Sequence, residues 1–473
     1  MKKSHHIYIL LALTLAVIAL YMAVRPDRLD PSAAFVSALS FIIGIIPGYF
    51  LIFSPDKARP MPLLPAIGFF HAIMLGLSPL LISGRWAEDD LLVRVPRFGV
   101  EPALVLFAGL ALMLGCAWLG RTYLFSRLKT PLGQREHSNG TARLLLWGLL
   151  AIHMAFYALP WANTVPSLSP FVRSAGTAAF AGLLLMGWRG QIPRWEFGAV
   201  LLVILPVRLV LGYLTSAVGE SIYLCGALLF VLFHLRPRMI FGLVAVVCTL
   251  AVLSYKPVHI YRSAVVDQGY LNGSISEKLG VLAAVIVDPS HYGHDVNKSD
   301  WDIGRRLAHA EVMNTVMAAT PEQVPYWNGK TYKLLLSNLV PRLLWPDKPL
   351  ENQGNEFGRR YGFVKADNLT TSMNLPWLVE AFVNFGIPGV LGISAAIGLL
   401  IGLVEALFNR PGAPWQLAVS AIMLLPFINQ DSNLSLSIGN LLTIFVALMI
   451  YFRGGFHVGD FARRRMGWTT GER

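Results

Sequence analysis

Charged residues are scarce in this chain of 473 residues, because Asp, Glu, Lys and Arg make up only 14% of it. A soluble protein usually has about a quarter. Hydrophobic residues reach 55%, so the composition excludes an ordinary soluble domain and predicts a polytopic membrane protein. Cysteine is also rare: Cys116, Cys225 and Cys248 all lie inside apolar runs, without the spacing of a metal site or a disulfide framework.

Twelve apolar segments are long enough to cross about 30 Å of hydrocarbon. The first, residues 7–24, follows a short basic head and is followed by Arg25 and Asp27 rather than by a small-residue cleavage site, so it predicts an uncleaved signal anchor. The other predicted spans are residues 33–54, 61–83, 98–120, 142–162, 171–188, 195–215, 218–235, 239–256, 376–408, 414–430 and 433–452. The predicted fold class is therefore all-α, with about twelve transmembrane helices.

These spans divide the chain into four parts. Residues 1–256 are predicted to hold nine transmembrane helices, and residues 257–375 form one long polar loop with amphipathic helices. Residues 376–452 hold the last three spans, and residues 453–473 form a basic tail.

Lysine and arginine are concentrated in alternate short loops, as expected for loops that stay in the cytoplasm. The loops assigned to that side contain Lys57, Arg59, Arg121, Arg127, Lys129, Arg135, Arg143, Arg189, Arg194, Arg236, Arg238 and Arg410. The opposite loops at residues 163–170, 215–221 and 429–435 have neither residue type, although Arg25, Arg28, Arg85, Arg94 and Arg97 depart from the pattern. The distribution predicts that both termini are cytoplasmic and that the long loop faces outward.

The tenth predicted span is interrupted by Phe-Gly-Ile-Pro-Gly at residues 385–389, which must distort the helix. Broken helices at membrane depth usually line cavities that are buried in protein or filled with water. Glu380 and Asn384 are four residues apart and would share one face just beneath the long loop. They are candidates for a cavity lining; alternatively, Glu380 pairs with a buried arginine.

A helical pattern begins in the long loop at Asp302, which could cap it. Arg305, Arg306 and His309 would form a polar patch on one side of this helix. The patch could bind an anion, or the helix could lie at the membrane interface with its arginines in water.

Two further arginines stand close to or inside predicted spans. Arg262 directly follows the ninth span and could join an anion site from the membrane side. Arg208 lies within the seventh span, where a central arginine costs about 2.5–3.5 kcal/mol, so it needs a partner or water, or it snorkels to the interface. Acids and bases balance over residues 257–375, so an anion site there requires selected arginines to be brought together by folding.

The most distinctive stretch combines Gly-Lys-Thr-Tyr at residues 329–332 with Val-Pro-Arg-Leu-Leu-Trp-Pro-Asp-Lys-Pro at residues 340–349. This stretch, at the end of a long outward loop before the last three spans, resembles the bacterial oligosaccharide repeat-unit polymerases, the Wzy-type O-antigen polymerase family. The resemblance implies a metal-independent, cofactor-free glycosyltransferase of the GT-C type. Such an enzyme moves a growing glycan from undecaprenyl diphosphate to the next lipid-linked repeat unit on the periplasmic side of the bacterial inner membrane.

The acidic segment at residues 295–302, which includes Asp300-Trp301-Asp302, is only a minor candidate for a metal site, and the resemblance implies a metal-independent transfer. Arginines can stabilise a departing diphosphate in place of a metal. The residues expected to bind diphosphate or sugar are Arg208, Arg262, Arg305, Arg306, Tyr332, Arg342, Trp345, Lys348, Arg359 and Arg360. The candidates for a catalytic base are His309, Glu380 and His259.

The partners implied by the resemblance are lipid-linked oligosaccharides, membrane lipid, a flippase and a chain-length regulator, and not nucleic acid. Two other functions stay open. A glycan ligase would share the fold and the arginines, and a flippase or other transporter would share the many spans and the broken helix.

Overall fold

The computed structural model describes residues 3–27, 29–53, 56, 58–82, 97–133, 137–158, 168–214, 224–229, 233, 249, 260–261, 264–265, 269, 273–288, 307–338, 340, 344–345, 347–348, 352–369 and 371–466. Within these residues the chain is helical, and its one extended pairing is an isolated bridge between Leu29 and Phe98. The prediction of an all-α chain is confirmed for this part.

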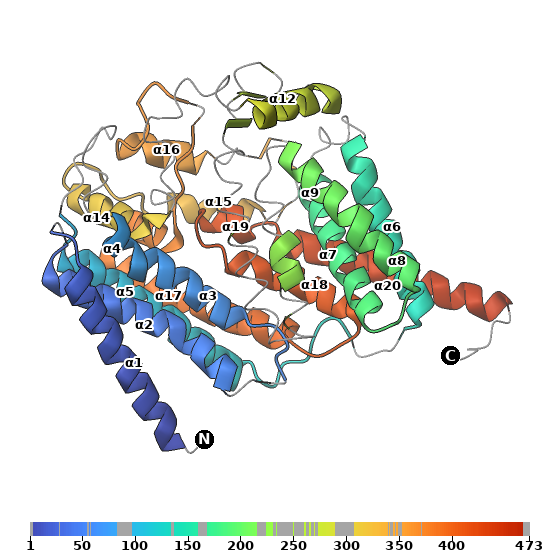
Figure 1. The fold of residues 1–473 in the computed structure, drawn as a ribbon, viewed down its shortest axis with the longest axis horizontal. Coiled ribbons are helices and arrows are strands. Elements are labelled where there is room, and N and C mark those ends of the chain that lie inside the picture. Colours follow the sequence, from blue (N-terminus) through green and yellow to red (C-terminus); the bar gives the residue numbers. More distant parts are fainter. Residues whose placement is uncertain are drawn as a thin grey trace.

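The N-terminal half of the chain contributes two groups of helices (Figure 1). The first group contains α1 (Lys3–Val24), α2 (Pro31–Phe53), α3 (Leu63–His71), η1 (Ala72–Leu77), α4 (Ser78–Ile82), α5 (Val100–Leu119) and η3 (Gly120–Leu124). The second contains α6 (Asn139–Ala158), α7 (Leu168–Trp188), α8 (Arg194–Ala199), η5 (Val200–Ile204) and α9 (Leu205–Leu214).

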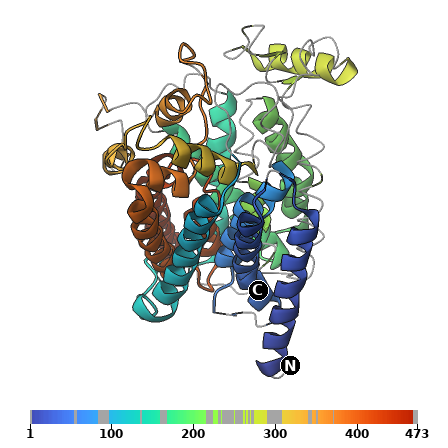
Figure 2. The ribbon, with the colours of Figure 1, turned by 90° about the vertical axis from the view of Figure 1, so that its left-hand side faces the viewer.

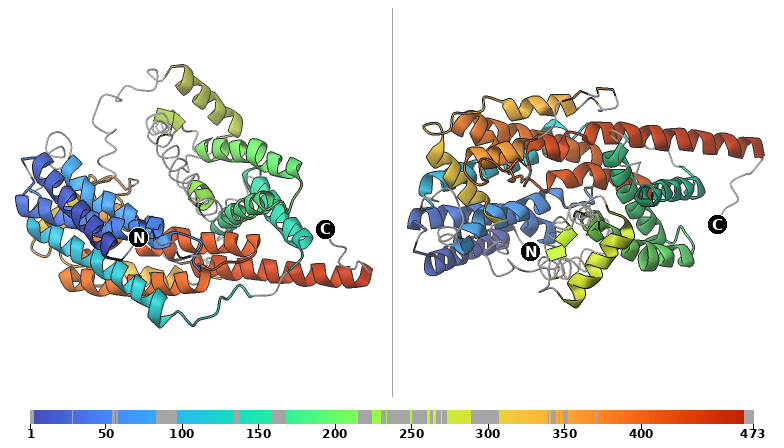
Figure 3. Two further views of the ribbon diagram at one scale, coloured as in Figure 1. Left: turned by 60° about the horizontal axis from the view of Figure 1, so that its bottom comes forward. Right: turned by 90° about the horizontal axis from the view of Figure 1, so that it is seen from above.

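The C-terminal half supplies short helices at one end of the bundle and long helices through it. The short ones are α12 (Ile275–Val287), α14 (His309–Ala319), α15 (Lys330–Asn338), α16 (Gln353–Arg360) and α19 (Leu434–Ile438). The others are α17 (Trp377–Phe408), α18 (Pro414–Leu424), η8 (Leu425–Phe427) and α20 (Leu441–Met466). Figure 3 shows α20 on the side of the molecule near the C-terminus, where its end projects beyond the other helices.

The core is built by α17, which packs along α5, and by α7, which packs against α6 and α18. Small residues allow the first of these contacts to be close, as is usual between helices in membranes. At Gly398 of α17, an added Cβ would lie 2.4 Å from the Met113 carbonyl oxygen of α5. A larger side chain at this position would therefore push the two helices apart.

Eight helices among the described residues are long and apolar enough to cross a membrane, which is the architecture of a polytopic membrane protein. They are His6–Val24, Pro31–Phe53, Leu63–Leu81, Val100–Leu124, Leu168–Trp188, Arg194–Gly212, Trp377–Phe408 and Leu434–Ala462. Helix α6 also covers the described part of the predicted span at residues 142–162, and α18 with η8 covers residues 414–427 of the predicted span at residues 414–430. The predicted spans at residues 218–235 and 239–256 lie almost entirely outside the described residues.

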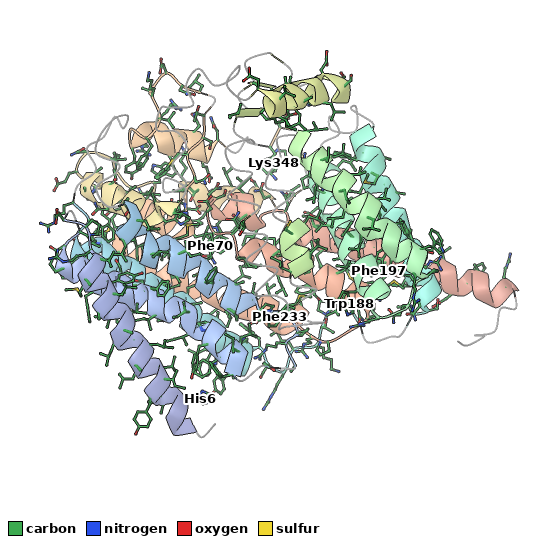
Figure 4. All side chains as sticks on the ribbon, in the orientation of Figure 1. His6, Phe70, Trp188, Phe197, Phe233 and Lys348 are labelled. Atoms are coloured by element: carbon green, nitrogen blue, oxygen red, sulfur yellow. The ribbon has the colours of Figure 1, made fainter. Side chains whose placement is uncertain are left out.

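The two ends of the bundle differ in character (Figure 2). One end carries α12, α14, α15, α16 and α19, and we call it the loop-rich end; the opposite end carries the start of α1, and we call it the N-terminal end. Figure 4 labels Lys348 towards the first end and His6 at the second.

The α14 helix differs from the expectation of an interfacial amphipathic helix. Residues 309–316 are all buried, and α14 packs against α17, α5, α4 and η1. The interfacial alternative is therefore wrong for α14, because its polar residues face protein rather than water. The helix begins at His309, and Asp302, Arg305 and Arg306 lie outside the described residues.

Candidate functional site

The α17 helix is broken near the loop-rich end at Gly386, where φ is +66° and ψ is −155°. Pro388 has no N–H, so the carbonyl of Asn384 cannot make its usual helical hydrogen bond. Asn328 donates its backbone N–H to that carbonyl at 3.2 Å, and the N–H of Trp327 binds the preceding carbonyl at 2.8 Å. The broken helix therefore docks the loop that leads into α15.

Glycine is required at the break. The left-handed φ of Gly386 is unfavourable for other residues, and an added Cβ would lie 2.9 Å from the Tyr326 hydroxyl oxygen. The predicted interruption at residues 385–389 is confirmed.

Glu380 lies in the first turn of α17 and is completely buried. Its Oε2 accepts a hydrogen bond of 2.7 Å from the backbone N–H of Leu434, the first residue of α19. Asn384, one turn further along, donates from Nδ2 to the Glu380 carbonyl and to Thr331 Oγ1 of α15, both at 2.8 Å. The predicted shared polar face of Glu380 and Asn384 is confirmed, and it faces protein groups from α15 and α19.

A chain of side-chain amides extends from this face. Gln353 donates from Nε2 to the Thr331 carbonyl at 3.1 Å, and Asn433 donates to Gln353 Oε1 at 2.6 Å. Asn433 also donates to Ser435 Oγ at 2.8 Å, and Asn338 donates to the Ser435 carbonyl at 3.2 Å. We call Glu380 and Asn384, together with these five residues, the polar layer. Its members come from α15, α16, α17 and α19, so it links four helices beneath the long loop.

Tyr332 is packed beside the polar layer, with its ring stacked on Phe385 at 6.1 Å. Burial raises the pKa of the Tyr332 phenol well above its usual value, and the negative charge of Glu380 raises it further. Among the described residues, its buried hydroxyl has no hydrogen-bond partner. Tyr332 therefore offers a neutral hydroxyl donor next to the buried carboxylate.

His309 at the start of α14 contacts the carboxylate of Asp431. The distance between His309 Nε2 and Asp431 Oδ1 is 2.7 Å, and Asn374 donates to the other carboxylate oxygen. The ring of Phe70 meets the imidazole edge to face at 5.8 Å. These contacts hold the imidazole in one orientation, and a carboxylate at Nε2 favours the tautomer with its proton on that nitrogen.

The His309–Asp431 pair and the polar layer meet in one turn. Residues 430–434 connect η8 to α19, and the turn binds His309 through Asp431 and Glu380 through the N–H of Leu434. Gln430 adds a hydrogen bond of 2.8 Å to His71 of α3. The two candidate catalytic residues His309 and Glu380 are therefore held by the same short segment.

Other predicted site residues have different positions. Arg359 donates to Asn355 at 2.8 Å, and Arg360 lies over the Trp327 ring at 5.6 Å. Trp345 is exposed, whereas Lys348 is buried in the predicted turn, with its N–H donating to the Trp345 carbonyl.

Arg208 is buried on α9, which packs against α12, so it belongs to a different part of the molecule from the polar layer. The predicted residues His259, Arg262, Arg305, Arg306 and Arg342 lie outside the described residues. In the part of the chain that is described, no three His, Cys, Asp or Glu side chains are grouped so that they could hold a metal ion.

The sequence analysis missed Asp431, Asn433 and Gln353 as members of the site. A signal was present, because residues 429–433 read Asn-Gln-Asp-Ser-Asn, five polar residues in succession between two apolar spans. We treated this stretch only as a loop without lysine or arginine.

The sequence matches the family described as "Domain of unknown function (DUF8712)" over residues 124–409, more than half of the chain. The chain belongs to the DUF8712 family. The DUF8712 segment includes His309, Tyr332 and Glu380 and ends before Asp431. No curated protein and no solved structure matches the chain.

Glu311, on α14 of this DUF8712 protein, is a buried carboxyl close to the site. Burial raises its pKa from the usual 4.5 to about 7. Its Oε2 accepts a long hydrogen bond of 3.5 Å from Ser78, and its Oε1 has no partner among the described residues. The folded protein therefore favours the protonated form of Glu311.

This raised pKa predicts a loss of stability with rising pH. Between about pH 4.5 and 7 the unfolded chain gives up the Glu311 proton while the folded protein retains it, so the free energy of unfolding falls by up to about 3 kcal/mol. Glu311→Gln, which stays neutral, should raise the melting temperature at about pH 8 and have little effect at about pH 5. An equal change at both values would show that Glu311 does not titrate as its burial indicates.

Proposed function

We propose that this protein is a GT-C-type glycosyltransferase that polymerises undecaprenyl-diphosphate-linked oligosaccharide repeat units. It acts on the periplasmic side of the inner membrane of a bacterium and makes a surface polysaccharide. The proposal includes twelve spans, with both termini in the cytoplasm and the loop-rich end outside.

The placement of arginine supports this orientation. Arg59, Arg121, Arg189 and Arg410 surround one cavity, and Arg453 binds the Pro131 carbonyl in a loop that also lines it. These loops lie at the N-terminal end of the bundle (Figure 1). Since short cytoplasmic loops carry an excess of lysine and arginine, this end is the one expected in the cytoplasm.

The observation that carries the proposal is the contact of buried His309 with half-buried Asp431 beside the polar layer. Burying polar groups in a membrane protein is costly, so the several amides, the carboxylate and the imidazole buried at this end of an apolar bundle favour a functional role. Polar groups at that depth suit a substrate with an apolar tail and a polar glycan. A lipid-linked oligosaccharide has this form.

The chemistry of glycan transfer assigns a role to His309. The acceptor sugar hydroxyl gives its proton to Nδ1 of His309 while its oxygen forms a bond to the anomeric carbon of the donor. The bond from that carbon to the diphosphate oxygen breaks, and the lipid diphosphate leaves with the bonding electron pair. Asp431, bound to Nε2, stabilises the imidazolium that forms.

As its bond to the sugar breaks, the leaving diphosphate gains negative charge, which hydrogen-bond donors must stabilise. Tyr332 supplies a neutral hydroxyl donor. From the resemblance, Arg342, Arg359 and Arg360 are expected to bind the same diphosphate. Preorganised donors of this kind stabilise the negative charge that develops on the phosphate oxygens.

Deletion of the gene tests the reaction itself. Loss of a polymerase should leave surface glycans of a single repeat unit on a gel. Long chains that remain on the carrier lipid would instead indicate a ligase, and repeat units trapped in the cytoplasm would indicate a flippase.

Substitution of the His–Asp pair tests the base. His309→Ala should lower the rate of chain extension by about 10²–10⁴-fold, the usual contribution of general base catalysis. Asp431→Asn should lower it by about tenfold or more, because the amide no longer fixes the imidazole tautomer. His457→Ala is the matched control, since His457 is exposed on α20. Full activity of His309→Ala at normal abundance would remove His309 from the mechanism.

Arg342 is tested as the diphosphate ligand. Arg342→Ala should abolish chain extension, by roughly a hundredfold or more, without lowering the amount of protein in the membrane. Arg342→Lys should be severely impaired, because lysine lacks the planar two-pronged donor. Lys365→Ala, at an exposed position of the same loop, is the control.

The competing interpretation is that Arg342 only fixes the loop by pairing with Glu351 or Glu356. Glu356 already binds Lys330, at 2.6 and 2.7 Å. A purely structural Arg342 would give less protein or a lower melting temperature, with activity per folded molecule retained.

A further inference from the structure

A cavity of about 1040 Å³ opens at the N-terminal end of the bundle, opposite the loop-rich end that holds the polar layer. Its walls come from the segments that follow α2, η3, α7 and α17 and from the starts of α6 and α18. Ligand sites in proteins are usually about 300–1000 Å³, so the space is sufficient for a polar headgroup.

The cavity is cationic. Arg59, Arg121, Arg189 and Arg410 line it, and Glu405 is the one acid among its described lining residues. Glu405 is already bound, since both of its oxygens lie 3.2 Å from Nη1 of Arg121. Arg59 is also paired, with Asp56 at 2.9 Å, and after both ion pairs the described lining still carries an excess of positive charge.

The helix termini that reach the cavity add little net charge to it. The N-termini of α6 and α18 and the C-termini of α7 and α17 all reach the cavity, so their partial charges largely oppose one another. Three of the arginines do bind backbone carbonyls: Arg59 donates to Arg121 at 3.0 Å, Arg189 to Gly412 at 3.2 Å, and Arg410 to Ala406 at 2.7 Å and Leu128 at 2.5 Å. These bonds hold the loops, but holding loops does not require a cavity of this size.

A second, apolar cavity of about 420 Å³ adjoins the first. The two share Arg59, Arg121 and Glu405, so these three side chains stand between them. The remaining walls of the second cavity are mainly apolar side chains of α2, α3 and α5, including Phe50, Leu114 and Trp118. A cationic cavity joined to an apolar one matches a molecule with a negative head and a hydrocarbon tail.

We propose that the paired cavities bind an anionic phospholipid, with its phosphate among the arginines and one acyl chain along α2 and α5. Arginine binds phosphate oxygens bidentately, and basic pockets between transmembrane helices on the cytoplasmic side bind lipid headgroups in this way. The exposed side chains of Trp118, Tyr123 and Trp188 near the cavity are those expected at the level of the headgroups. Trp188 is labelled in Figure 4. The site is separate from the proposed glycan-transfer site and does not depend on it.

The chain offers variants that test the head and the tail separately. Arg189 is exposed and lines only the cationic cavity, so Arg189→Gln removes one charge from the lining of the head site. Gly115 lines only the apolar cavity, and an added Cβ there meets no atom within 4 Å, so Gly115→Leu places a side chain in the tail site. Arg453→Gln is the control, because Arg453 binds the Pro131 carbonyl at the same end but lies outside the cavity lining.

The experiment titrates the purified full-length protein with phosphatidylglycerol, phosphatidylcholine or inorganic phosphate and follows bound lipid by native mass spectrometry and stability by thermal shift. Phosphatidylglycerol should bind more tightly than phosphatidylcholine. Arg189→Gln and Gly115→Leu should each weaken phosphatidylglycerol binding by about tenfold, or about 1.4 kcal/mol. Arg453→Gln should bind like the unaltered protein, and all three variants should keep its melting temperature without lipid.

Other results would overturn the lipid assignment. If inorganic phosphate binds as well as phosphatidylglycerol, and Gly115→Leu has no effect, the site belongs to a soluble phosphate. If Arg189→Gln leaves phosphatidylglycerol binding unchanged, or Arg453→Gln weakens it equally, the cavity is not an anion site.

Discussion

The hydrogen bond from the Leu434 N–H to the Glu380 carboxylate joins the two halves of the loop-rich end. A carboxylate that is completely buried must find hydrogen-bond donors within the protein, since no water competes for it. The bond connects α17 to the start of α19, and the turn before α19 carries Asp431 and Asn433 to their partners on α14 and α16. Together with the bonds made by Asp431 and Asn433, this contact between distant parts of the chain holds the candidate site in place.

The sequence predicted the features of the fold that depend on interactions within a single segment. The apolar runs gave helices where they are described, and Gly386 and Pro388 predicted the break, because a missing N–H and a left-handed backbone act on their own segment. The four-residue spacing of Glu380 and Asn384 likewise predicted a shared face.

The rest of the site depends on tertiary contacts that no local pattern contains. Asp431 meets His309 across 122 positions of the chain, and Asn433 meets Gln353 across 80. The burial of α14 was also missed, because its polar residues suggested a surface helix and their partners lie on other elements. The roles proposed for Arg262, Arg305, Arg306 and Arg342 rest on the sequence and its resemblance, because these residues lie outside the described part of the chain.

The break in α17 also has a mechanical consequence. Pro388 cannot compete for the Asn384 carbonyl, so that carbonyl remains bound to the loop at Asn328. The first turns of α17 thereby belong with the loop-rich end, while the remainder is a separate rod within the bundle. A bilayer that changes thickness can tilt that rod, and because the rod is uncoupled at Gly386, the tilt is not transmitted rigidly to Glu380.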